Sequence, residues 1–204
     1  MLISHKYKFI FIKTKKTAGT SIEIELNKIM AIEDVVTPIK PSHKEHNPRN
    51  YVYNGFKLFN HMMVSDLKKI IPKEMFDNYF KFCVEREPVD KCLSEFFMYK
   101  NSPYHSEKNQ KISWENYIEN GNFPIDTNKY TDDKNNLIID KIIKYENLEE
   151  EFFELSKKLD FKFNGINVRE KSGFREELFV SKEDRDIIYK AFSSSNKFTG
   201  YLNC

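Results

Sequence analysis

A strand, a short basic turn and a helix follow one another directly in residues 8–25, which read KFIFIKTKKTAGTSIEIE. The apolar run at residues 9–12 is typical of a buried strand, and a helical pattern begins right after the turn. The first turn of a helix presents unpaired backbone N–H groups and the positive end of the helix dipole, which attract anions. Hydroxyl and ammonium groups of the turn add donors and charge, and Gly19 allows a ligand to approach the backbone. We therefore predict a phosphate-binding loop.

The sequence of this loop differs from the common nucleoside-triphosphate loop, G-x-x-x-x-G-K-S/T, because it has one glycine and its lysine precedes that glycine. Residues 16–21 (KTAGTS) instead resemble the 5′-phosphosulfate-binding loop of sulfotransferases, whose pattern is roughly P-K-T-x-G-T-S. Lys15 stands where that family usually has proline, which removes some rigidity and adds charge. Taken alone, the segment also fits a lysine-rich surface turn whose hydroxyl side chains cap a helix.

A second strand–helix junction follows at residues 80–99. Residues 80–85 read as a buried strand, Pro88 suits the first turn of a helix, and apolar residues then recur at helical spacing. Arg86 and Ser94 resemble the family's 3′-phosphate motif, in essence R-x-P-x-x-x-x-x-S. A planar guanidinium can bind a phosphate through two hydrogen bonds, and a hydroxyl adds another. The alternative is a surface arginine that caps a helix and a serine in the helix interior.

Two further segments extend the resemblance. Residues 140–148 (DKIIKYENL) resemble the family's late strand and following helix, and residues 198–201 (FTGY) resemble its usual end. The chain thus resembles sulfotransferases that use 3′-phosphoadenosine 5′-phosphosulfate (PAPS), in particular the carbohydrate group that includes heparan sulfate 2-O-sulfotransferase. The resemblance implies PAPS as the donor, 3′-phosphoadenosine 5′-phosphate (PAP) as the product, a carbohydrate hydroxyl as the acceptor, and no metal ion. Glu146 matches a family carboxylate that orients the site.

The resemblance also implies roles for individual residues. Lys16 would stabilise charge on the leaving oxygen, and Arg86 and Ser94 would hold the 3′-phosphate. The 5′-phosphate would be held by Lys16, Thr17, Ala18, Gly19, Thr20 and Ser21. Relatives use a basic loop before the last helix near the 3′-phosphate and adenine, and here that loop contains Arg169, Lys171 and Ser172. On charge alone, these last three residues fit a solvated turn equally well.

An acceptor hydroxyl needs a general base, and histidine has the ordinary pKa best matched to neutral pH. Of the five histidines, His61 precedes a helix-start pattern in NHMMVSDLKKII, which is similar to the family segment that carries the catalytic histidine. The alternative is a core or capping histidine whose hydrogen bonds are satisfied internally. His43 and His46 are spaced i, i+3, but a proline-rich loop favours solvated side chains over a metal pair.

Strand and helix patterns alternate, with strands near residues 7–12, 80–85 and 139–144 and helices near 20–30, 88–99 and 147–159. The alternation predicts an α/β fold. The resemblance implies a three-layer, P-loop-like fold, in which helices flank a central, mainly parallel sheet. We expect a single domain over residues 1–204. A short helix near 113–120 and a last helix from near Ser181 are also predicted, and residues 31–60 and 100–135 otherwise read as long loops or lids.

Composition limits the possible partners. The formal charge is only +2, so the chain lacks the basic field typical of nucleic-acid-binding proteins. No apolar run approaches the ~20 residues of a membrane span, and three cysteines are too few for a disulfide framework. We expect a cytoplasmic protein that binds neither nucleic acid nor membranes. Two alternatives to a sulfotransferase stay open: a nucleotide kinase or other phosphoryl transferase, and a non-catalytic PAP-binding module.

Overall fold

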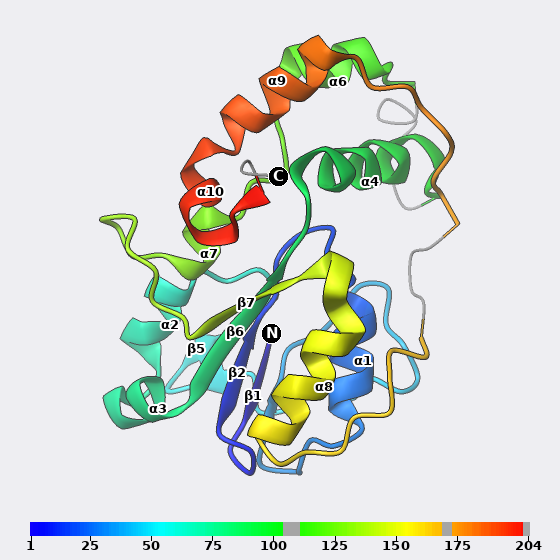
Figure 1. Cartoon of the computed structure of the whole chain (residues 1–204). Coiled ribbons are helices and arrows are strands. Elements are labelled where there is room, and N and C mark those ends of the chain that lie inside the picture. Colours follow the sequence, from blue (N-terminus) through cyan, green and yellow to red (C-terminus); the bar gives the residue numbers. More distant parts are fainter. Residues whose placement is uncertain (104–110, 169–172, 202–204) are drawn as a thin grey trace.

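The computed structural model describes residues 1–103, 111–168 and 173–201. A five-stranded sheet with the strand order β3-β1-β2-β6-β7 lies at its centre (Figure 1). Its strands are β1 (Leu2–Ser4), β2 (Phe9–Ile12), β3 (Val35–Val36), β6 (Phe80–Glu85) and β7 (Lys141–Lys144). A separate antiparallel pair consists of β4 (Val52–Tyr53) and β5 (Phe56–Lys57).

Strand direction in the central sheet is mixed but mostly parallel. β2 is parallel to β6 and β6 to β7, whereas β1 is antiparallel to both of its neighbours, β2 and β3. The three parallel strands therefore end at the same edge of the sheet, and a loop leaves each of them there. The predicted mainly parallel sheet is confirmed as a mixed sheet with a parallel core. β1 and β3 were not predicted. They are three and two residues long, respectively, which is too short for an alternation of apolar and polar residues to be recognised.

The helices agree with the sequence patterns where those patterns are long. They are α1 (Gly19–Asn27), α2 (Val64–Ile70), α3 (Lys73–Asn78), α4 (Pro88–Asn101), α6 (Trp114–Asn120), α7 (Thr127–Tyr130), the 3₁₀ turn η1 (Tyr145–Asn147), α8 (Leu148–Lys158), α9 (Lys182–Ala191) and α10 (Ser193–Thr199). Ser181 caps α9 as predicted, since its hydroxyl accepts from the backbone N–H of Asp184 at 3.0 Å. The segments read as long loops contain β3, β4, β5 and α7, so that interpretation was wrong in part.

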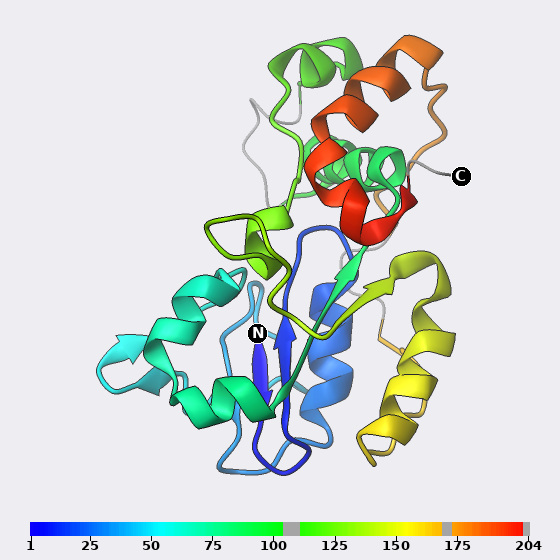
Figure 2. The ribbon, with the colours of Figure 1, turned by 60° about the vertical axis from the view of Figure 1, so that its left-hand side comes forward.

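Alternation along the strands builds two apolar layers, one on each face of the sheet. Phe9, Phe11 and Phe82 face α1 and α8, in a cluster that includes Ile22 and Phe152. The residues between them belong to a second cluster with α2 and α3, which contains Ile10, Ile12, Cys83, Leu67 and Phe76. Figure 2 shows α1 and α8 on one side of the sheet and α2 and α3 on the other. The sheet is thus the middle of three layers.

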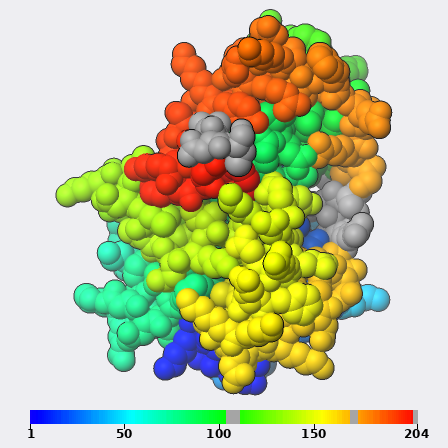
Figure 3. All heavy atoms as spheres, viewed as in Figure 1, coloured from blue at the N-terminus to red at the C-terminus, as the bar shows by residue number. Residues whose placement is uncertain are grey.

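A third apolar cluster lies beyond the end of the sheet, where α4 packs with α6 and α9. Trp114 stacks on Tyr117 and meets Phe96 edge-on at 5.2 Å between ring centroids. The indole N–H of Trp114 donates to Asp184 at 3.0 Å, which ties α6 to α9. In the space-filling view the surface of α9 and α10 lies directly above that of α8 (Figure 3). This layer places one wall of helices over the strand ends.

Two composition-based expectations concern the interior and the membrane. Cys83 and Cys92 are buried free thiols, while Cys204 lies outside the described residues. Burial raises the pKa of both thiols, so each behaves as a small apolar side chain. Over the described ranges, no helix is both long and apolar enough to cross a membrane.

The central role of Phe82 gives a test of this core. Its side chain is fully buried and its ring lies 5.3 Å from that of Phe11 and 5.9 Å from that of Phe152. We expect Phe82→Ala to lower the free energy of unfolding by about 3–5 kcal/mol in urea denaturation followed by circular dichroism. The control, Phe179→Ala, removes a ring that is 89% exposed and should change the free energy of unfolding by less than about 0.5 kcal/mol. Equal losses in the two variants would contradict this description of the core.

Candidate functional site

One cavity of about 1000 Å³ opens at the edge where the parallel strands end. We call it the central cavity. It is bounded by the loop after β2, the start of α1, the β6–α4 junction and the η1 turn after β7. The predicted residues that line it are Lys16, Thr17, Ala18, Gly19, Thr20, Ser21, His61, Arg86 and Ser94. Arg169, Lys171 and Ser172 lie outside the described residues, although Val168 and Gly173 on either side line the same cavity.

The loop after β2 has an unusual backbone. Lys16 and Ala18 have φ angles of 60° and 57°, in the left-handed region that non-glycine residues rarely occupy. Ala18 is the N-cap residue of α1, and its carbonyl accepts from the N–H of Ile22 at 3.0 Å. Such conformations cost free energy and persist only where surrounding contacts hold them, which is typical of binding loops.

The hydroxyl groups of the loop do not all serve the cavity. Thr17 is buried, and its hydroxyl lies 2.9 Å from that of Thr14. The Thr14 hydroxyl in turn donates to the backbone carbonyl of Val84 in β6. Thr20 accepts from the ammonium of Lys13 at 3.2 Å. Thr17 therefore helps to anchor the loop to the neighbouring strand, through Thr14. Because its hydroxyl is used in this way, the predicted contact of Thr17 with a phosphate would be made by its backbone N–H.

Gly19 is required by packing rather than by its backbone angles. A Cβ atom at this position would lie 2.8 Å from Cγ of Lys13, a distance that real structures do not show. The ammonium of Lys13 is paired with the buried carboxylate of Glu23 in α1. Lys13 is only 5% exposed, and its ammonium shares the Glu23 carboxylate with the N-terminal amine. Among the three lysines of this segment, the ion pair with Glu23 belongs to Lys13 and not to Lys15 or Lys16.

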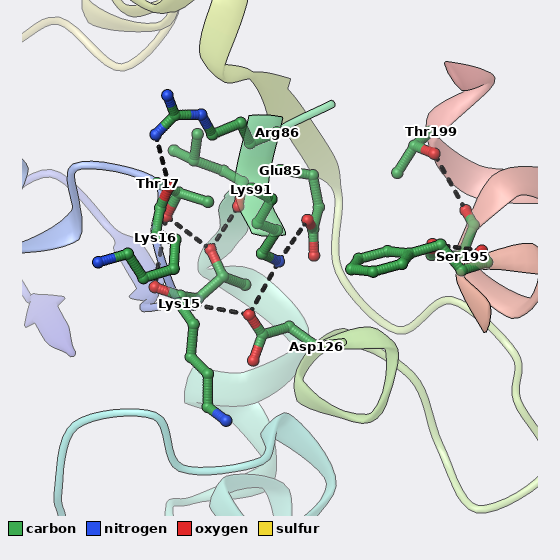
Figure 4. A network of polar contacts seen from close by, with 12 residues as sticks. Lys15, Lys16, Thr17, Glu85, Arg86, Lys91, Asp126, Ser195 and Thr199 are labelled. Atoms are coloured by element: carbon green, nitrogen blue, oxygen red, sulfur yellow. Dashed lines mark hydrogen bonds and ion pairs between the residues drawn. The ribbon is translucent and has the colours of Figure 1, made fainter. Parts of the chain in front are cut away.

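Lys16 extends towards α4, where its Nζ atom lies 2.8 Å from the sulfur of Met98. Its backbone carbonyl accepts from Nη1 of Arg86 at 3.2 Å (Figure 4). The loop after β2 and the β6–α4 junction are therefore joined directly, across 70 residues of sequence. This contact brings the two predicted phosphate-binding elements together.

Arg86 lies in an ion-pair cluster. Its Nε donates to Asp90, which also accepts from Arg175, so two guanidinium groups share one carboxylate. The Arg86 guanidinium lies 4.1 Å from the centre of the Tyr145 ring. Burial raises the pKa of Asp90, but the two arginines outweigh this effect and hold it below its usual value. Because two guanidinium groups share one carboxylate, this ion-pair cluster carries one positive charge in excess, and Ser94 lines the cavity nearby.

His61 is held in one tautomer. Its Nδ1 lies 3.0 Å from the backbone carbonyl of Lys13, and because a carbonyl can only accept, Nδ1 carries the hydrogen. Nε2 is then the ring nitrogen with a lone pair. Burial and the positive charge of Lys13 lower the pKa of His61 to about 4, so the imidazole is neutral at neutral pH. The residue itself has a left-handed backbone, with φ of 61°.

Glu146 acts as a structural link. One carboxylate oxygen accepts from the backbone N–H of Glu87 at 2.8 Å, and the other accepts from the hydroxyl of Tyr201 at 2.7 Å. The start of α4, the η1 turn and the end of the described chain are thereby joined. This agrees with the structural role assigned to Glu146, and it brings the closing Tyr201 to the site.

Sequence reasoning missed several charged residues at or near the cavity. Arg175, Asp90 and Glu95 line it, and Asp126 accepts from the backbone N–H of Lys15. Glu95 is 4% exposed, burial raises its pKa, and it accepts from the Tyr117 hydroxyl at 3.1 Å. Glu95 had one available signal, since it follows Ser94 on α4. Arg175 and Asp126 belong to irregular segments without a recognisable motif, so only the fold identifies them.

Metal chemistry has no evident ligand set here. Within the described ranges, no group of three or more His, Cys, Asp or Glu side chains is arranged to hold a metal ion. His46 is buried rather than solvated, contrary to the prediction from its proline-rich context. Burial lowers its pKa to about 4, as it does for His61.

Comparisons with known proteins place the chain beside an archaeal relative. No protein-family model matches the chain. An alignment of 101 residues relates it, at 34% identity, to an uncharacterized protein of Archaeoglobus fulgidus. The match covers 46% of this chain and 78% of the archaeal protein. The chain belongs to the same family as that protein. Because the relative's name states no activity, the functional argument depends on the residues of the central cavity.

The burial of His61 in its neutral form predicts a pH dependence of stability. The pKa of His61 falls from about 6.5 in the unfolded chain to about 4 in the folded protein, so protonation favours the unfolded chain. The contribution of neutral His61 to the free energy of unfolding is therefore lost as the pH falls from 6.5 to 4. We expect the free energy of unfolding to drop more steeply between pH 6.5 and pH 4 in the wild type than in His61→Asn, measured by urea denaturation. Asparagine tolerates the left-handed backbone, and His46 is present in both proteins. Identical pH slopes would contradict the burial of a neutral His61.

Proposed function

We propose that this protein is a PAPS-dependent sulfotransferase that transfers a sulfuryl group to an acceptor hydroxyl, in the first instance that of a carbohydrate. One observation carries the proposal. The loop at residues 16–21 and the Arg86–Ser94 pair, identified in separate parts of the sequence as phosphate-binding elements, line one cavity together with His61.

The residues of the central cavity fit a nucleotide that carries phosphate at both ends. The loop and the N-terminus of α1 suit the 5′ side, because a helix N-terminus and an ammonium group attract anions. Arg86, Ser94 and the additional charge of Arg175 suit the 3′-phosphate. A cavity of about 1000 Å³ is large enough for a nucleotide and part of an acceptor.

The side chains divide the chemistry between them. PAPS, when bound, supplies the sulfuryl group. The Lys16 ammonium donates a hydrogen bond to the bridging oxygen, which keeps the electron pair of the breaking S–O bond. Nε2 of His61 takes the proton of the acceptor hydroxyl while the acceptor oxygen forms its bond to sulfur. The Lys13 carbonyl keeps the His61 ring oriented through Nδ1, at 3.0 Å.

Binding of the product analogue tests the nucleotide assignment without an acceptor. Calorimetric titration should give micromolar affinity for PAP and much weaker binding of 5′-AMP, which lacks the 3′-phosphate. Arg86→Ala should weaken PAP binding by about ten- to a hundredfold, because a charge-assisted contact is lost. Arg175 still pairs with Asp90 in this variant. Arg185→Ala, an exposed arginine of α9, is the control and should bind as the wild type does. Equal affinity for PAP and AMP, or tighter binding of ATP with Mg²⁺, would favour the phosphoryl-transferase alternative.

Turnover separates the enzyme from a non-catalytic binding module. With radiolabelled PAPS and a panel of oligosaccharide acceptors, Lys16→Met and His61→Asn should each lower the transfer rate by about 10²–10⁴-fold. His61→Asn should keep its affinity for PAP, since its proposed role is towards the acceptor. The control Lys190→Met, on the exposed face of α9, should retain the wild-type rate. Wild-type rates in both site variants would refute these roles, and PAP binding without transfer to any acceptor would indicate a binding module.

A further inference from the structure

A buried ion network lies directly beneath the phosphate loop. The ammonium of Lys91 in α4 is fully buried, 2.8 Å from Glu85 and 2.9 Å from Asp126 (Figure 4). Both carboxylates are buried as well, at 3% and 1% exposure. A buried ammonium is tolerated only when it is paired and hydrogen-bonded, so the three side chains must be considered together.

Asp126 has a second partner, which belongs to the phosphate loop. Its Oδ2 accepts from the backbone N–H of Lys15 at 2.6 Å as well as from Lys91. Asp126 occupies the N-cap position of α7, yet its side chain makes no capping hydrogen bond there. The carboxylate is therefore committed to the loop rather than to the helix that follows it. Its other oxygen and one oxygen of Glu85 have no partner among the described residues.

The contact falls at the point where the loop needs support. Lys15 immediately precedes Lys16, the first of the residues with a left-handed backbone in this loop. The loop has two further anchors to β6 and its end: the Thr14 hydroxyl on the Val84 carbonyl, and the Lys16 carbonyl on Arg86. Asp126 supplies a third anchor, across 111 residues of sequence. Strained conformations persist when several contacts over-determine them, and the Asp126 and Arg86 contacts are both charge-assisted.

Asp126 does not line the central cavity itself. Its carboxylate accepts from Lys15 and Lys91, so it acts on the cavity through the loop.

We infer that Asp126 is a positioning residue: held by Lys91, its carboxylate fixes the Lys15 N–H and sets the turn that presents Lys16. The part that concerns the loop stands on the geometry alone. The part that concerns Lys16 in transfer rests on the proposed function.

Glu85 provides a matched control. It carries the same charge as Asp126 and binds the same ammonium, but its contacts do not include the loop. Burial and Asp126 both raise the pKa of Glu85, so Glu85→Gln is the milder way to remove one carboxylate from Lys91. Asp126→Ala removes the acceptor for Lys15. Asp126→Asn, which preserves shape, is used if the alanine variant does not fold, because a neutral amide oxygen in the place of Oδ2 lacks the charge that strengthens both hydrogen bonds.

The first measurement is amide hydrogen exchange of Lys15 by NMR in the ligand-free protein. We expect exchange at this amide to become about tenfold faster or more in the Asp126 variants, and to stay within about twofold of the wild type in Glu85→Gln. Unchanged exchange in the Asp126 variants, or equal acceleration in Glu85→Gln, would overturn the inference.

Titration with PAP then separates this inference from the proposed function. If the wild type binds PAP, the Asp126 variants should bind it about tenfold more weakly and Glu85→Gln should bind it as the wild type does. Equal PAP affinity in the wild type and the Asp126 variants would overturn the positioning role. If the wild type does not bind PAP, the proposed function fails, while the exchange of the Lys15 amide still decides whether Asp126 positions the loop.

Discussion

The parallel pairing of β2 with β6 is the constraint on which the site depends. In this register Phe9 lies opposite Phe80 and Ile12 opposite Cys83, so the two strands deliver their following loops to the same edge of the sheet. The loop that contains Lys16 begins directly after Ile12 at the end of β2, and Arg86 follows β6 directly. The Arg86–Lys16 contact is a consequence of that pairing. A shift of register by one residue would exchange the two faces of the strand and separate these groups.

The apolar layers hold this pairing in place. Phenylalanine rings on one face and aliphatic side chains on the other bury β2 and β6 on both sides, as expected for the parallel part of a sheet. Large buried rings leave little room for an alternative register, because interiors are packed at crystal-like density. The core therefore determines where the loops start, and local contacts determine their shape.

In three places at or near the site, a basic side chain is paired with one or two carboxylates. Lys13 is paired with Glu23, Lys91 with Glu85 and Asp126, and Arg86 with Asp90. Each carboxylate lowers the cost of holding a cation away from water, and each fixes a side chain or backbone group near the cavity. Lys16 and Arg175 add positive charge at the cavity wall. The cavity lining carries as many acidic as basic side chains, so these pairs do not make the whole cavity positive; they hold individual cations in place before any ligand arrives.

The sequence by itself determined the long elements and the residues that meet in the cavity. The strand–turn–helix at residues 8–25, the R-x-P junction at Arg86 and the His61 segment each carry a local pattern, and the periodicity of side chains makes such patterns readable without a fold. Which other residues pack against these segments and hold them in place was decided by the tertiary structure alone. Short strands such as β3, the burial of Lys13, the second arginine at Asp90 and the Asp126–Lys15 contact leave no local signal. They arise between residues far apart in the chain, and hydrogen bonds and ion pairs across such separations exist only once packing has brought the segments together.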